Sequence, residues 1–73
     1  MEFHPLRSIR LDRGLAIAAV AVRARVASGT IITIEKYGHN PRPETKQRLA
    51  AALGVEVEAI WPASEEHQHN SGV

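Results

Sequence analysis

Apolar residues near the start of the chain recur three positions apart, the spacing of a helix with one buried face. Leu6 and Ile9 follow this spacing just after Pro5, and arginines occupy the other faces. Gly14 can adopt the left-handed conformation that commonly closes a helix. We therefore predict a short first helix that ends at about Arg13.

Two longer stretches of helix-forming residues follow. Residues 16–23 contain no glycine or proline, although Ala16 has no side-chain acceptor that would cap a helix. The other stretch begins at Pro43, since proline suits the first position of a helix, and ends before Gly54. In that stretch we expect Leu49, Ala50, Ala52 and Leu53 to face inward and Lys46, Gln47 and Arg48 to face largely outward.

The segment from Gly29 to Ile34 is ambiguous. Its β-branched residues favour a strand. The apolar spacing of Val26, Ile31 and Ile34 favours a helix, and no other part of the chain offers a partner strand. A lone strand would leave backbone groups unpaired. We predict a helix, largely on the strength of the family pattern described below.

The remaining segments and the composition indicate one small domain. Asn40-Pro41 marks a turn, and Val57, Ile60 and Trp61 predict a last short helix that Pro62 ends. Residues 63–73 are too polar to fold, so we expect a domain over 1–62 and a disordered tail. The chain has no cysteine and no apolar run of about 20 residues, which excludes disulfides and predicts a cytoplasmic protein without a membrane span.

Charge is distributed unevenly. Residues 1–53 carry nine Lys and Arg against four acidic residues, a net charge of +5, whereas residues 54–73 carry four Glu, a net charge of −4. This asymmetry favours a polyanionic partner for the first part of the chain. The alternative is an ordinary solvated surface followed by an acidic tail.

As an ordered set, several short motifs resemble the Cro/CI-type (XRE, lambda-repressor-like) helix-turn-helix family over about Pro5 to Pro62. They are Leu6-Arg7-x-Ile9-Arg10-x-x-Arg13-Gly14-Leu15, Val20-Ala21, Val26-Ala27-Ser28, Thr30-Ile31-x-x-Ile34-Glu35, Asn40-Pro41 and Leu49-Ala50-x-Ala52-Leu53-Gly54-Val55. The resemblance implies a compact all-α domain of four to five helices, with the helix-turn-helix at about residues 16–36. It further implies a protein of a prokaryotic cell or a phage, associated with the nucleoid.

The resemblance also assigns structural roles. Ala21 must be small, because two helices of the motif cross there. A core between the second and third helices is expected from Val20, Ala24, Val26, Ile31 and Ile34. Arg10 and Glu35 match the internal ion pair of the family, although two solvated charges are the alternative.

In this family the third helix, here about residues 28–36, lies in the major groove of DNA. The positions that match base contacts are Ala27, Ser28, Gly29, Ile32 and Thr33. None carries the Gln, Asn or Arg side chain that makes bidentate base contacts, and Ala27 and Ile32 can meet only thymine methyl groups. We therefore expect modest direct readout.

Phosphate contacts are expected around this helix. Ile17 stands where many members have a phosphate-binding glutamine, so only its backbone N–H can contribute. The candidate side chains are Arg13, Arg23, Lys36, His39, Arg42 and Lys46, with Lys36 and Arg42 the first choices. Arg25 occupies a turn position where the family usually has glycine.

The sequence thus predicts a regulator, a repressor by default, that binds double-stranded DNA as a homodimer without a cofactor, metal or catalytic activity. The alternative function is a protein-interaction module, antitoxin-like or part of an assembly, in which DNA binding is secondary. Its contact residues would be Leu11, Val22, Ile60 and Trp61, for which burial in the core is the competing interpretation. His67 and His69 lie in the predicted tail and make a poor metal site.

Overall fold

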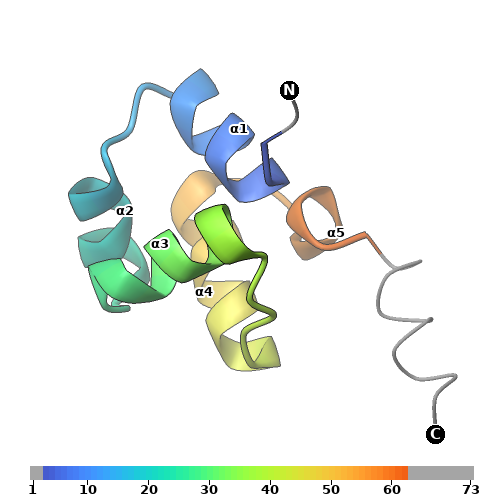
Figure 1. Ribbon diagram of the computed structural model, residues 1–73. Helices are drawn as coiled ribbons and strands as arrows, with labels where there is room; N and C mark the ends of the chain where they lie inside the picture. Colours follow the sequence, from blue (N-terminus) through green and yellow to red (C-terminus); the bar gives the residue numbers. More distant parts are fainter. Residues whose placement is uncertain (1–2, 63–73) are drawn as a thin grey trace, which may run out of the picture.

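A computed structural model describes residues 3–62 of the chain, and within them the fold is all-helical. The helices are α1 (Pro5–Asp12), α2 (Ile17–Ala24), α3 (Ser28–Tyr37), α4 (Pro43–Leu53) and α5 (Val57–Ile60). Figure 1 shows α3 crossing α4, with α2 on one side and α5 on the other. The predicted tail, including His67 and His69, lies outside the described residues.

The ambiguous segment is a helix, as predicted, and its packing explains why. Ile31 and Ile34 of α3 are completely buried, and burying each contributes roughly 1.5 to 3 kcal/mol. The helix propensity of a β-branched residue is worse than that of alanine by at most about 0.7 kcal/mol. Burial of one helical face therefore offsets the local preference for a strand.

The core lies where α2 packs against both α3 and α4, and where α5 packs against α1 and α4. Ala21 and Ala24 of α2 are buried there, and small side chains let the helices approach closely. Val26 packs against the core while remaining partly exposed. The buried apolar residues are Leu6, Val20, Ala21, Ala24, Ile31, Ile34, Leu49, Ala50, Leu53, Ile60 and Trp61.

Lys46 does not point outward, so that expectation was wrong. It is only 6% exposed, and its Nζ lies 5.5 Å from the centroid of the Trp61 ring. The reason is its register, because Lys46 shares one stripe of α4 with Leu49, Ala50 and Leu53 at helical spacing. Its alkyl stem therefore belongs to the buried face.

Ile60 and Trp61 are core residues, so of the two interpretations burial in the core is right and a protein contact through them is wrong. Ile60 is fully buried and Trp61 is 3% exposed. The His4 and Trp61 rings meet in a T-shaped arrangement, with 6.2 Å between the ring centroids. The short helix α5 thus folds back and extends the core instead of presenting an apolar surface.

The connection between α2 and α3 has helix-turn-helix geometry. The two helices differ in direction by 119°, and three residues separate them. Arg25, the first of these, has φ +59° and ψ +47°, the left-handed conformation that usually requires glycine. No single helix of residues 3–62 is long and apolar enough to cross a membrane, although α2 and α3 taken together as a bent pair meet that test by length and composition.

We expect Arg25→Gly to raise the free energy of unfolding by about 0.5 to 1 kcal/mol, because glycine adopts the left-handed conformation without strain. The matched control is Arg23→Gly, two residues earlier inside α2, which should lower stability by about 0.5 to 1 kcal/mol. Urea denaturation followed by circular dichroism measures both. A stability loss at Arg25 equal to that at Arg23 contradicts the strain assigned to this turn.

Candidate nucleic-acid interface

The outward face of α3 gathers the residues expected to contact bases. Ile31 and Ile34 point into the core, so positions three or four residues apart on the opposite face point to solvent. Those exposed positions are Ser28, Gly29, Ile32, Thr33 and Lys36, with Ala27 exposed at the N-cap. All five predicted base-contact positions therefore share one surface at the N-terminal half of α3.

Side-chain chemistry on this face is sparse. The Thr33 hydroxyl donates a hydrogen bond to the Thr30 carbonyl oxygen at 2.9 Å, which leaves its lone pairs for an outside partner. Ile32, 37% exposed, is the largest apolar side chain among the five predicted base-contact residues. Gly29 has no side chain, and a Cβ built at its position would meet nothing within 4 Å.

The N-termini of α2 and α3 both lack side-chain caps. Ala16 and Ala27 occupy the N-cap positions and make no side-chain hydrogen bond. The first N–H groups of a helix have no partner within the helix and carry a partial positive charge. The backbone N–H of Ile17, at the first position of α2, is therefore suited to an anion, whereas its side chain packs against the core.

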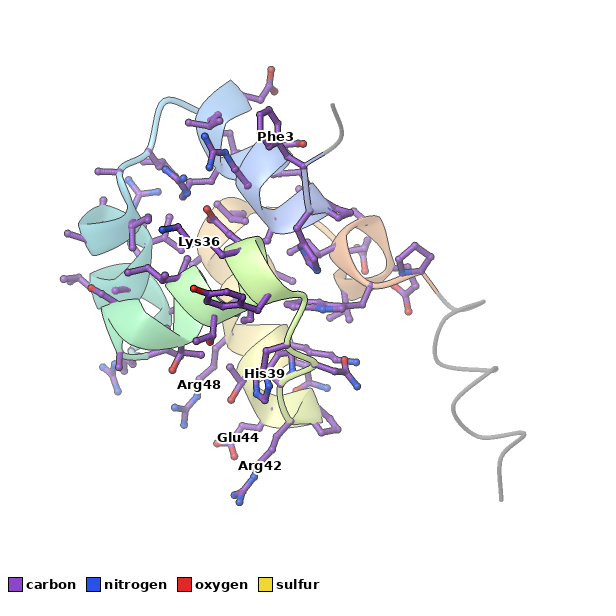
Figure 2. The ribbon with its side chains drawn as sticks, viewed as in Figure 1. Phe3, Lys36, His39, Arg42, Glu44 and Arg48 are labelled. Atoms are coloured by element: carbon purple, nitrogen blue, oxygen red, sulfur yellow. The ribbon has the colours of Figure 1, made fainter. Side chains whose placement is uncertain are left out.

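The basic candidates do not form one group. Lys36, His39 and Arg42 are all exposed and follow one another from the last turn of α3 through the loop to α4. Figure 2 shows His39 on this loop and Arg42 extending away from the N-terminal end of α4. Arg13 lies after α1, with its Nη1 3.8 Å from Asp12 Oδ2.

Arg23 lies elsewhere, in an open groove of about 560 Å³ between α2 and α4. Arg25 and Arg48 line the same groove, and neither was among the predicted phosphate contacts. Arg48 Nη2 also lies 2.7 Å from Glu44 Oε2, one helical turn earlier. That spacing of four residues is visible in the sequence, but only the packing of α2 on α4 brings the three arginines together.

Burial argues against a phosphate contact from Lys46. Its side chain lies beneath Trp61 in the core. A phosphate of a DNA duplex reaches only surface groups, so we leave Lys46 out of the proposed interface.

An ion pair holds α3 in place. Arg10 Nε donates to Glu35 Oε2 at 2.8 Å and Arg10 Nη2 donates to Glu35 Oε1 at 3.0 Å. Arg10 Nη1 also donates to the Leu15 carbonyl oxygen at 2.8 Å, so one guanidinium joins α1, the connection to α2, and α3. The two side chains are only 9% and 3% exposed, which rules out the alternative of two solvated charges. The hydrogen bond with Glu35 raises the pKa of Arg10 above its already high ordinary value, so the guanidinium stays charged.

Two of the proposed protein-contact residues are exposed. Val22 is 78% exposed on the outer face of α2, and Leu11 is 49% exposed near the end of α1. With Ile60 and Trp61 in the core, any apolar protein contact among the four residues would rest on these two.

Comparison with known proteins agrees with this geometry. A family model described as helix-turn-helix matches residues 6–60, which is most of the chain and spans the Arg10–Glu35 pair, α2, α3 and α5. No curated protein matches the sequence. Domains of the matched family bind DNA in regulatory roles and are not typically enzymes. The chain therefore belongs to the Cro/CI-type (XRE) helix-turn-helix family of DNA-binding regulators.

Proposed function

We propose that this protein regulates transcription by placing the outward face of α3 in the major groove of double-stranded DNA. The observation that carries the proposal is the gathering of Ser28, Gly29, Ile32 and Thr33 on one exposed surface. The ion pair between Arg10 and Glu35 fixes that helix on the core. Docking of this second helix of the motif in the major groove is the usual geometry of helix-turn-helix domains.

Phosphate contacts flank the helix in this proposal. Lys36, His39 and Arg42 meet the backbone beside the C-terminal half of α3, because all three are exposed on or after its last turn. The N–H group of Ile17 and the guanidinium of Arg13 meet the backbone near the start of α2. These contacts position the domain, whereas the N-terminal half of α3 faces the base edges.

The bound form is a homodimer, and repression is its default effect. Two copies related by a two-fold axis place their α3 helices in half-sites about one helical turn apart. Occupying a promoter in this way blocks it without requiring a further contact. Sedimentation with and without a bound duplex gives the oligomeric state, and a single protomer on DNA contradicts the dimer.

We expect DNA affinity to fall steeply with salt, because each neutralised phosphate contributes a slope of about −0.9 to log K against log salt. Arg42→Ala should reduce that slope by about 0.9 per bound protomer and weaken binding to all sequences alike. Fluorescence anisotropy from about 50 to 200 mM salt measures both effects.

The control for this experiment is Arg48→Ala, which removes the same charge from the α2–α4 groove, where Glu44 already pairs with it. Its slope should match that of the original chain. Equal losses in the two variants mean that the phosphate contacts are assigned to the wrong residues, and an affinity insensitive to salt rules out the proposed function.

The exposure of Val22 supports a second candidate function, a protein-interaction module in which α2 grips a partner and DNA binding is secondary. A Val22→Asp variant separates the two functions, because this side chain lies outside the face of α3. Unchanged DNA affinity favours DNA binding as the primary role. A complex of defined stoichiometry that Val22→Asp abolishes, together with no shift of any DNA fragment, favours the second candidate.

A further inference from the structure

We propose that α3 recognises A·T base pairs chiefly through the C5 methyl group of thymine, with Ile32 as the contact and Gly29 as the point of closest backbone approach. This inference rests on the proposed function, since it concerns the same face of α3. It goes further by naming the class of base that the helix selects and the residues that select it.

The hydrogen-bonding groups on this face are poorly suited to guanine. Guanine presents two acceptors in the major groove and is read by bidentate donors such as Arg or Lys. Among the base-facing residues only Ser28 and Thr33 carry polar side chains, and each is a single hydroxyl. The proton of the Thr33 hydroxyl is already used in its 2.9 Å bond to the Thr30 carbonyl oxygen. Lys36 is the one long donor on the outward face of α3, and it lies in the last turn, where the proposed function assigns it to phosphate. None of the five base-facing residues is therefore a bidentate donor for guanine.

Ile32 supplies the positive part of the argument. It keeps 37% of its surface exposed although its neighbour Ile31 is fully buried. The C5 methyl of thymine is the apolar group that a base presents in the major groove, so it is the natural partner for an aliphatic side chain. Contact with thymine removes both groups from water, which a contact with cytosine or guanine cannot do to the same extent.

Thr33 fits the other half of the same base pair. An A·T pair shows the thymine methyl together with the adenine N6 amino donor. The lone pairs that Thr33 Oγ1 keeps after its bond to Thr30 can accept from that amino group. Ile32 and Thr33 are consecutive in α3, so the helix offers an apolar side chain and an acceptor about 100° apart. On the base pair the thymine methyl and the adenine amino group are likewise separated, by the thymine O4.

Gly29 is not needed by the fold itself. It does not have a positive φ, unlike Gly14, Gly38 and Gly54, and the space around its missing Cβ is open. Glycine at such a position costs helix stability relative to alanine. Because Gly29 lies three and four residues before Ile32 and Thr33, it leaves bare backbone beside both. That bare backbone lets a base edge and its methyl group come close to the helix.

The experiment begins with selection of bound sites from random duplexes, which we expect to enrich A·T pairs. Each thymine of the selected half-site is then replaced by 2′-deoxyuridine, which keeps the pairing and removes only the methyl group. At the thymine that faces Ile32, affinity should fall about fourfold per half-site, the equivalent of one buried methyl-sized group. In the Ile32→Ala variant the same replacement should have no effect.

Gly29→Ala is the second arm. Since alanine favours the helix, the thermal midpoint of this variant should equal or exceed that of the original chain. The affinity of the variant for the thymine duplex should fall several-fold, and its discrimination between thymine and uracil should shrink. A protein that only needed glycine for folding would instead lose stability. Circular dichroism and anisotropy are measured on the same samples.

The outcomes separate this inference from the proposed function. If the original chain binds no duplex, both are overturned. If it binds with strong salt dependence but uracil replaces thymine at every position without loss, or if the selected sites are rich in G·C pairs, the proposed function stands and the thymine contact is overturned. Undiminished affinity in Gly29→Ala overturns the role of the bare backbone.

Discussion

Replacing Glu35 with alanine is expected to lower the free energy of unfolding by about 3 to 5 kcal/mol, because it leaves the Arg10 guanidinium buried without its carboxylate. Two hydrogen bonds of 2.8 and 3.0 Å are lost, and the side chain of Arg10 is only 9% exposed to water. Domains of this size are typically stable by about 5 kcal/mol or a little more. The variant should therefore retain little of the stability of the original chain and be partly unfolded even without denaturant.

Guanidinium chloride unfolding, followed by circular dichroism, measures this loss. The matched control is Glu44→Ala, which removes the carboxylate of the exposed Glu44–Arg48 pair. The distance between Arg48 Nη2 and Glu44 Oε2 is 2.7 Å, as short as in the buried pair, so the two pairs differ in burial and not in length. That change should cost less than about 0.5 kcal/mol, because exposed ion pairs are screened by water. Similar losses for Glu35 and Glu44 contradict the argument from burial.

The double variant Arg10→Met with Glu35→Leu distinguishes a lost attraction from an unpaired buried charge. Replacing both partners by apolar side chains of similar volume is often close to neutral in stability. We therefore expect it to be more stable than Glu35→Ala by a few kcal/mol. A double variant as unstable as the single one means that the ion pair itself, and not the unpaired charge, dominates the loss.

The pH dependence of the pair follows from the raised pKa of Arg10. A group whose pKa is higher in the folded protein adds stability that is complete below its unfolded pKa and is lost only as pH rises through the folded value. Both values lie at strongly alkaline pH, because the hydrogen bonds that Arg10 donates to Glu35 raise an already high pKa. Titration of Arg10 should therefore add no slope to stability between about pH 6 and 9.

Trp61→Ala is expected to cost about 3 to 5 kcal/mol, the usual loss when a buried aromatic side chain is truncated to alanine. Trp61 is 3% exposed and contacts both Lys46 and His4, so its removal opens a cavity between α5, α4 and α1. Trp61→Phe should cost clearly less. Phenylalanine fills most of the space and removes an indole N–H that is buried without a hydrogen-bond partner.

Thermal unfolding followed by circular dichroism suits this comparison, because the chain has one tryptophan and the variants lose its fluorescence. Val22→Ala serves as the control. Its side chain is 78% exposed, and a change there should alter stability by no more than about 0.5 kcal/mol. If Trp61→Ala is as stable as Val22→Ala and instead loses binding to a partner protein, Trp61 is an interface residue and the assignment to the core is wrong.

Several features followed from the amino-acid sequence alone, some from local rules and others from the resemblance to the family. Gly38 ends α3 with φ +68°, and Pro43 begins α4, as the helix-ending and helix-starting preferences of these residues predict. The order of motifs around Arg10 and Glu35 was enough to predict the family and the ion pair. The resemblance to the family also supplied the base-facing set of Ala27, Ser28, Gly29, Ile32 and Thr33, whose role in DNA recognition stays a prediction.

Tertiary structure decided what local rules left open. Residues 29–34 have the composition of a strand, and they form a helix because Ile31 and Ile34 gain more from burial than β-branched side chains lose in helix propensity. From its charge alone, Lys46 is expected at the surface. It is buried because α5 folds back and places Trp61 against it. The grouping of Arg23, Arg25 and Arg48 in one groove likewise needs the contact of α2 with α4. Each case depends on residues distant in sequence, whose combined burial outweighs the preference of any single position.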